Sequence, residues 1–252
     1  MRLLEKLNML IKLSKCDVAL FDTQHEKTML FFKTLKISSN VLHNLKNKTV
    51  MFVGCGGITG VMLEHLLSVG IKKYILIDGD VVNQSNLNRQ HIFNDEDIGK
   101  QKVVILKDYI NKKIQKSHVY ILPSFIYNKE DIISNVSIVP DFIVCAADMP
   151  LTAIKRIVAE TAINFNCPCI FGGVSVFEGG VGPLLVTKDD KLAFVKEQSF
   201  IEDNVNYFSA CNSSFGPTNS IIASYMAIET VMYLTDARYC KSLNKEMLIR
   251  FF

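Results

Sequence analysis

The chain has 252 residues, of which 49% are apolar and 21% are charged, and its net charge at pH 7 is +3. This composition predicts a folded chain with a substantial core and excludes a disordered one. A net charge this small gives no reason to expect a nucleic-acid partner, and no stretch approaches the roughly 18 uninterrupted apolar residues of a membrane span.

The cysteines and the N-terminus bear on the compartment. Seven cysteines occur without a paired spacing, and several lie inside apolar runs, so we expect reduced core thiols. Cys167 and Cys169 form one close pair, but a zinc site needs two such pairs. The first 15 residues are amphipathic and do not have the pattern of a signal peptide. The sequence therefore predicts a cytoplasmic protein without a membrane partner.

The chain divides into an N-terminal arm and one larger domain. Residues 1–45 predict a helical arm, which we interpret either as a cap on the sheet or as a dimerisation element. Residues 46–252 predict a single α/β domain.

The stretch from Thr49 to Lys102 predicts a nucleotide-binding unit. An apolar run, Val50–Val53, predicts a strand buried on both faces of a parallel sheet. Three glycines follow at once, where the chain turns before a helix: Gly54, Gly56 and Gly57. Such a turn directs backbone N–H groups toward a phosphate at the N-terminus of the helix.

A second strand, Tyr74–Ile77, ends in Asp78 and Asp80, where an acid can bind a ribose hydroxyl. The glycine turn departs from the dinucleotide pattern, because Thr59 stands at its third glycine position and Gly60 comes one residue late. We expect Thr59 to crowd the contact between helix and strand. Taken alone, the turn is also compatible with a dehydrogenase.

Two cations in the following polar segment favour ATP over a dinucleotide. Asn86, Arg89 and Lys102 lie beyond the second strand, where a hydride-transfer enzyme has no need of them. Arg89 could bridge phosphate oxygens, and Lys102 could neutralise charge on a leaving pyrophosphate. The alternative is a solvated basic patch. Asp148, after the fourth strand, could hold Mg²⁺ or could cap a helix.

Strands and helices alternate along the domain, which predicts a Rossmann-like, doubly wound and mainly parallel sheet. Beyond Gly173, glycines among β-branched residues predict antiparallel strands toward the C-terminus. Residues 188–212 are polar and poorly periodic, and we expect a mobile crossover loop or lid there. The other expected helices cover residues 97–112, 132–136, 151–164 and 220–233. The other expected strands cover residues 118–122, 141–147, 168–171 and 243–252.

The motifs in this stretch resemble those of the ThiF/MoeB-type adenylyltransferases, which are related to ubiquitin-activating enzymes. The resemblance rests on four segments, in which the family's GxGGxG, D-x-D, N-L-x-R-Q and G-x-x-K patterns stand as 54–57, 77–80, 86–90 and 99–102. It extends over about four-fifths of the chain. It implies that ATP is used to convert a carboxylate into an acyl-adenylate and pyrophosphate, generally by a homodimer.

By this resemblance, Asp78 or Asp80 would hold the ribose and Asp148 the Mg²⁺, while Asn86, Arg89 and Lys102 would hold the phosphates. The two Cys-x-x-Cys pairs of many members are absent, so we expect no zinc. An N-terminal arginine finger is also absent; either Lys27 substitutes for it or the finger is lost. Cys211 is the cysteine in a polar, loop-like setting, and it is a candidate nucleophile whose alternative is ordinary packing.

The leading interpretation is adenylation of a carboxylate on a peptide or small protein, as in the stand-alone enzymes that mature microcin- and pantocin-type peptide antibiotics. A second is activation of a ubiquitin-like sulfur carrier, which favours a catalytic Cys211. A third is ATP-dependent dehydration of a tRNA base, for which we would expect a more basic surface. The non-enzymatic alternative is a ThiF-like scaffold, against which Arg89, Lys102 and Asp148 argue.

Overall fold

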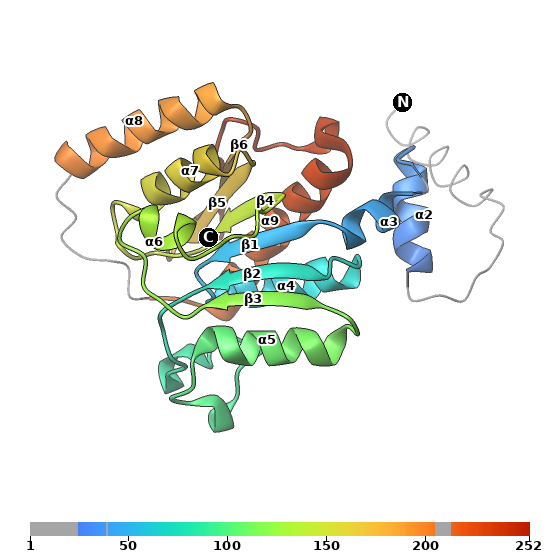
Figure 1. The fold of residues 1–252 in the computed structure, drawn as a ribbon, viewed down its shortest axis with the longest axis horizontal. Coiled ribbons are helices and arrows are strands. Elements are labelled where there is room, and N and C mark those ends of the chain that lie inside the picture. The colour runs from blue at the N-terminus through green and yellow to red at the C-terminus, as the bar shows by residue number, and fades with distance from the viewer. Residues whose placement is uncertain (1–24, 39, 205–212) are drawn as a thin grey trace.

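A single mixed β-sheet organises the protein. The computed structural model describes residues 25–38, 40–204 and 213–252. Its sheet has seven strands in the order β3-β2-β1-β4-β5-β6-β7 (Figure 1). The strands are β1 (Thr49–Val53), β2 (Lys73–Ile77), β3 (His118–Leu122), β4 (Phe142–Cys145), β5 (Cys169–Val174), β6 (Glu178–Leu185) and β7 (Met247–Arg250).

The first five strands are parallel, and β6 and β7 are antiparallel to their neighbours. The predicted Rossmann-like architecture is therefore confirmed. At the centre of the sheet, Val53 lies opposite both Ile77 and Cys145. The register thus brings the carboxyl ends of β1, β2 and β4 to one level, which is where open parallel sheets bind ligands.

Helices cover both faces of the sheet. The described helices are α2 (Glu26–Thr34), α3 (Val41–Lys46), α4 (Gly57–Ser68), α5 (Lys102–Lys113), α6 (Glu130–Ile133), α7 (Ile154–Asn164), α8 (Lys188–Asn204) and α9 (Gly216–Asp236). One core contains side chains of α4, α5 and α9, and a second core contains side chains of α6, α7 and α8. Strand residues alternate between them: Phe52 belongs to the first core, and Met51 and Val53 to the second. Both faces of β1 and β4 are buried, as their unbroken apolar runs predict.

The described part of the N-terminal arm is helical, as expected. Helices α2 and α3 lie beyond the amino-terminal ends of the central strands (Figure 1). His25 Nδ1 lies 3.1 Å from the carbonyl oxygen of Ser68, at the end of α4. The arm is thus attached at the edge of the sheet that lies opposite the carboxyl ends of the strands. Residues 1–24 of the predicted arm lie outside the described residues.

Two segments differ from the expectation. The expected loop at residues 188–212 is, over its described part, the 17-residue helix α8. Three buried side chains, Lys191, Phe194 and Gln198, face its core, and two of them are polar, so the helical period is weak in the sequence. The helix expected from residue 97 begins at Lys102, because Gly99 has a φ of +84° that a helix cannot continue through.

The cysteines, the length of the helices and the grouping of metal-ligand side chains are further features of the described residues. The five described cysteines are all buried and free. Within the described ranges, no helix is long and apolar enough to cross a membrane. Those same ranges contain no group of three or more His, Cys, Asp or Glu side chains that could hold a metal ion.

Candidate active site

The glycine turn between β1 and α4 approaches the neighbouring β4 segment closely. Gly54 has a φ of +92°, and a Cβ built there would lie 2.5 Å from the backbone nitrogen of Ala147. Any other residue would therefore meet both backbone strain and a backbone clash. The turn is fixed from the other side by the amide of Gly54, which donates to the carbonyl of Ile77 at 2.9 Å.

Thr59 does not crowd this turn, contrary to the expectation. Its side chain is completely buried, and its hydroxyl donates to the carbonyl oxygen of Gly54 at 2.6 Å. The threonine therefore reinforces the turn through a hydrogen bond that glycine could not make. The departure from the glycine pattern at Thr59 therefore stabilises the turn.

Asp78 ties the carboxyl end of β2 to the turn. One of its carboxylate oxygens accepts a hydrogen bond from the amide of Cys55 at 2.7 Å, and the other accepts from the amide of Asp80 at 2.7 Å. Bonds of this kind to an ionised acceptor are strong and hold the carboxylate in one orientation. Burial and the nearby Asp78 charge raise the pKa of the Cys55 thiol, so this cysteine in the turn is a neutral packing residue.

Lys102 is a buried cation whose partner is Asp80. Its side chain is only 6% exposed, and its Nζ lies 2.8 Å from Oδ2 of Asp80, whose side chain is 48% exposed. The backbone amide of Lys102 also donates to the carbonyl of Asp80 at 3.1 Å. The Lys102 ammonium acts against the rise in the pKa of Cys55, so its charge is felt at the glycine turn. The structure therefore brings Lys102, Asp78 and Asp80 together at this turn.

Arg89 lies beside the first turn of α4. A Cβ built at Gly57 would lie 3.4 Å from Cγ of Arg89 and 2.9 Å from Oδ1 of Asn219. The guanidinium donates to the carbonyl of Ser85 and to Oδ1 of Asn88, both at 2.9 Å, and it has no carboxylate partner in the described chain. Arg89 is thus oriented by neutral acceptors and keeps its charge available for an anion.

Asn86 has a structural role in the loop that carries Arg89. It is buried, and its Oδ1 accepts from the amide of Asn83 at 3.0 Å. The two asparagines form a reciprocal capping box around a short 3-10 helix, Gln84–Asn86. The structure therefore shows Asn86 shaping the loop that carries Arg89, and its assignment to a phosphate stays a prediction.

Two residues near the turn were not assigned from the sequence. Gln90 is 4% exposed, its Oε1 has no hydrogen-bond partner among the described residues, and its Nε2 lies 3.6 Å from a Cβ built at Gly56. Asn219, in the first turn of α9, lies against Gly57. The signal for Gln90 was its place directly after Arg89, whereas Asn219 reaches the turn only through the packing of α9 on α4.

Asp148 follows β4 at the same edge of the sheet and is exposed. The electrostatic influence of its carboxylate on Cys145 places it near the end of that strand. An exposed carboxylate beside a glycine turn and two cations fits a Mg²⁺–nucleotide site. The Oε1 atom of Gln90, which has no partner among the described residues, can accept a hydrogen bond there. The residues present therefore fit both a nucleotide and Mg²⁺.

Two further candidates do not join this cluster. Lys27 is exposed on α2, and the arm that carries it is attached at the opposite end of α4 (Figure 1). Within one chain it cannot reach the glycine turn, so its predicted role requires a partner subunit. Cys211 lies outside the described residues, and its role stays a prediction.

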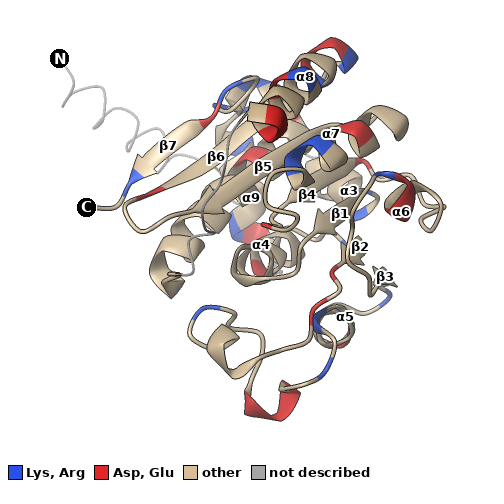
Figure 2. Ribbon diagram, turned by 90° about the vertical axis from the view of Figure 1, so that its left-hand side faces the viewer, with Lys and Arg blue, Asp and Glu red and all other residues tan. Residues whose placement is uncertain are grey.

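Charged residues of both signs occur along α8 and around the edge of the molecule (Figure 2).

A family model described as "ThiF family" matches residues 31–250. This range includes every candidate of the glycine-turn cluster as well as α8. The match therefore covers the whole sheet and not the nucleotide-binding unit alone.

Two curated relatives are similar over about three-quarters of the chain. One is a probable molybdopterin-synthase adenylyltransferase of Gracilaria tenuistipitata var. liui, 29% identical over 74% of this chain and 51% of its own length. The other is the adenylyltransferase and sulfurtransferase UBA4 of Candida albicans, 29% identical over 76% of this chain and 43% of its own length. The chain thus spans about half the length of the curated relatives it matches.

Among solved structures, E. coli MccB with AMPCPP and MccA is 25% identical. It superimposes with a TM-score of 0.75 and covers 91% of this chain and 69% of its own. The likeness extends over the sheet and the helices on both of its faces.

Proposed function

Since this chain belongs to the ThiF family, we propose that it is an ATP-dependent adenylyltransferase that activates a carboxylate on a peptide or small protein. One observation carries the proposal: two cations, Arg89 and Lys102, converge with Asp78 on a glycine turn at the carboxyl edge of the sheet. A dinucleotide site needs no such pair of cations, whereas a triphosphate that loses pyrophosphate does.

The reaction is a displacement at phosphorus. A carboxylate oxygen of the substrate attacks the α-phosphorus of ATP, the bond between that phosphorus and the bridging oxygen to the β-phosphorus breaks, and pyrophosphate departs. No proton moves, because the attacking carboxylate is ionised at neutral pH. The products are an acyl-adenylate and pyrophosphate.

The chain's own residues would bind and orient the nucleotide. The N-terminal amides of α4 and the glycine turn would receive phosphate oxygens, and Arg89 would hold them from above the first turn. Lys102 would exchange its bond to Asp80 for the negative charge that grows on the leaving pyrophosphate. Asp78, held by two amides, would position the ribose. Asp148 would hold Mg²⁺, which neutralises phosphate charge.

The finer assignment is maturation of a ribosomally made peptide. Its support is the structural likeness to MccB, a protein solved with AMPCPP and MccA. The alternative is activation of a ubiquitin-like sulfur carrier, and it is supported by the names of the molybdopterin-synthase adenylyltransferase and of UBA4. A homodimer, in which Lys27 would reach the partner's ATP, and a cytoplasmic location belong to the same proposal.

Pyrophosphate exchange tests the activity directly. The protein is incubated with ATP, Mg²⁺, labelled pyrophosphate and one candidate at a time, either a short precursor peptide or a small protein with a Gly-Gly C-terminus. We expect label to enter ATP with one candidate and not with the analogue whose C-terminal carboxylate is replaced by an amide. Absence of ATP binding, together with no exchange for any candidate, contradicts the proposal.

A further inference from the structure

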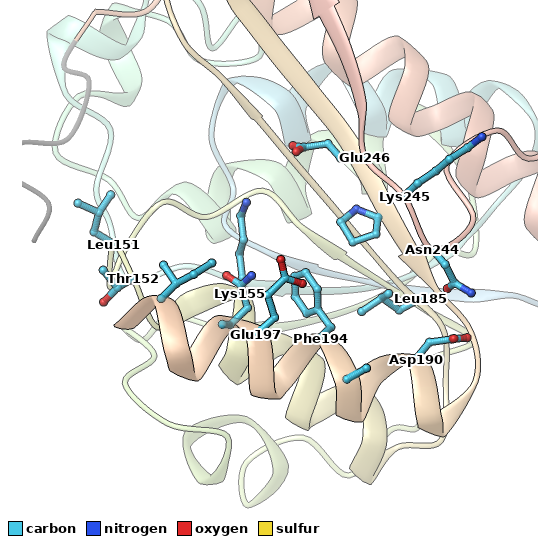
Figure 3. A pocket seen from close by; sticks show the side chains of 14 residues that line it. Leu151, Thr152, Lys155, Leu185, Asp190, Phe194, Glu197, Asn244, Lys245 and Glu246 are labelled. Carbon is cyan, nitrogen blue, oxygen red and sulfur yellow. The ribbon is translucent and has the colours of Figure 1, made fainter. Parts of the chain in front are cut away.

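A groove lies beside helix α8, on the face of the sheet that α7 also covers (Figure 3). It has a volume of about 690 Å³ and is lined by the start of α7, one side of α8, the strand β6 and the turn before β7. Its apolar walls include Leu151, Leu185, Phe194 and Ile201. From Asp190 to Ile201 the lining follows α8 over about 16 Å, the length of about five extended residues.

One end of the groove reaches the candidate active site. Leu151 and Thr152, which line it, come directly after the loop that contains Asp148. The charges of Lys155, another lining residue, and Asp148 act in opposite directions on the pKa of Cys145, the last residue of β4. The groove therefore opens at the carboxyl edge of the sheet, where the nucleotide would bind.

Three charged side chains that line the groove are not paired with one another. Lys155 comes from α7, Glu197 from α8 and Glu246 from the turn before β7, and all three are directed into the groove (Figure 3). None of the three has a hydrogen-bond or salt-bridge partner for its charged group within the described chain. The glycine at 180 leaves room for one of them, since a Cβ there would overlap the Glu246 carboxylate.

An extended peptide explains this combination of shape and charge. Apolar walls can cover its backbone and small side chains, Lys155 near the open end can attract a terminal carboxylate, and two carboxylates deeper in the groove can receive a cation. Asp190, farther along, is already committed to Thr187, whose hydroxyl donates to it at 2.5 Å. Lys155, Glu197, Lys245 and Glu246 are thus the charged lining residues without a partner for their charged groups in the described chain.

We propose that this groove binds the C-terminal segment of the substrate, with its carboxylate toward Lys155 and a basic side chain between Glu197 and Glu246. This inference rests on the proposed adenylation and names the class of substrate for it: an extended chain end with a basic residue a few positions before its carboxylate. The same chemistry applies to a free peptide and to the tail of a small protein.

Binding of labelled peptides tests the groove without ATP. The probes are fluorescein-labelled hexa-alanines whose third residue from the carboxyl end is alanine, arginine or glutamate, followed by fluorescence polarisation. We expect the arginine probe to bind about three- to tenfold more tightly than the glutamate probe, and a C-terminal amide to weaken it by a similar factor. Equal binding of the probes, or no binding up to about 1 mM, overturns the proposal.

A matched pair of variants locates the binding. Ala193→Trp places a large side chain into the groove, whereas Leu192→Trp places the same side chain on the neighbouring, non-lining position of α8. We expect the first to weaken the arginine probe more than tenfold and the second to leave it unchanged. Glu197→Lys should remove or reverse the preference for arginine over glutamate. Unchanged binding in Ala193→Trp places the peptide elsewhere and overturns the proposal.

Failure of the groove and failure of the activity give different results. If ATP does not bind and no exchange occurs, the adenylation is contradicted, while the polarisation of the peptide probes still reports on the groove. If exchange proceeds with a wild-type substrate KM in Ala193→Trp, the groove is contradicted and the adenylation is retained.

Discussion

The two halves of the sheet present their binding groups in different ways. In the parallel half, Asp78 is held by two backbone amides, and Lys102 is buried against Asp80. In the half that contains the antiparallel strands β6 and β7, the side chains of Lys155, Glu197 and Glu246 enter the groove without partners in the described chain. The first half is preorganised for one ligand, whereas the second can adapt to different peptide ends.

The two halves therefore carry different kinds of specificity. A nucleotide is the same in every turnover, so a rigid site with few adjustable groups serves it well. A chain end varies in sequence, and a groove with apolar walls and unpaired charges can select it by charge and length. Single substitutions can separate the contributions of the two halves.

The largest effect is expected from removing the cation of the parallel half. Lys102→Ala should lower the rate of ATP–pyrophosphate exchange about 100- to 1000-fold, because charge on the departing pyrophosphate loses its partner. The matched control is Lys48→Ala, which removes a 2.9 Å salt bridge to Asp141 at the other end of the strands. Exchange at the wild-type rate in Lys102→Ala would show that the phosphates bind elsewhere.

The second prediction concerns the rigidity of the glycine turn. Gly54→Ala should lower the free energy of unfolding by about 3 kcal/mol, because it adds a backbone clash to an unfavourable φ. Gly99→Ala, with a φ of +84° and no atom within 4 Å of its Cβ, should cost about 1 kcal/mol. Urea denaturation measures both variants. Equal losses would mean that the approach to Ala147 does not contribute.

The third prediction is a pH dependence of stability that arises from two buried thiols of the parallel half. Burial raises the pKa of Cys145 in β4 and of Cys167, just before β5, from 9.0 to about 12. The folded state therefore keeps these thiols neutral while the unfolded state ionises them above pH 9. Their contribution to stability is complete below pH 9 and is lost as the pH rises toward 12, by about 1 kcal/mol per pH unit for each thiol.

Urea denaturation between pH 9 and 11 checks this slope. Cys145→Ala should flatten it relative to the wild-type protein, whatever the variant's stability at pH 7. A slope that does not change in the variant would show that Cys145 does not carry the dependence.

The smallest effect is expected at the attachment of α8. The guanidinium of Arg156 in α7 donates two hydrogen bonds to the carboxylate of Glu202 in α8, from Nε at 2.8 Å and from Nη2 at 3.1 Å. Arg156→Ala should lower stability by about 1 kcal/mol and speed hydrogen exchange in α8 but not in α4. Arg238→Ala, which removes an exposed pair with Asp236, serves as the control and should change neither quantity. Unchanged exchange in α8 would mean that apolar contacts alone hold this wall.

The sequence predicts the parallel half closely, because its signals are local. A buried strand, a glycine with positive φ and an acid at the end of the next strand all leave marks within a few residues, as Gly54 and Asp78 illustrate. The parallel direction of β1 to β5 follows from the alternation of strands and helices.

The remaining features depend on contacts between distant segments. Helix α8 has few buried apolar side chains, so its period is hidden until β6 and α7 provide a surface for it. Asn219 reaches Gly57 only because α9 packs against α4. The groove joins residues 151–155, 183–201 and 244–246, which are far apart in the chain, and no short motif could indicate it.

The pairing of Lys102 with Asp80 also bears on how the protein is made. A buried ammonium without a counter-ion is strongly destabilising, and many phosphate sites would present one in their empty form. Here the chain supplies its own carboxylate, half exposed and 2.8 Å away, before any nucleotide is present. A newly synthesised chain can therefore fold without waiting for its ligand, and the arrival of ATP becomes an exchange of one anion for another.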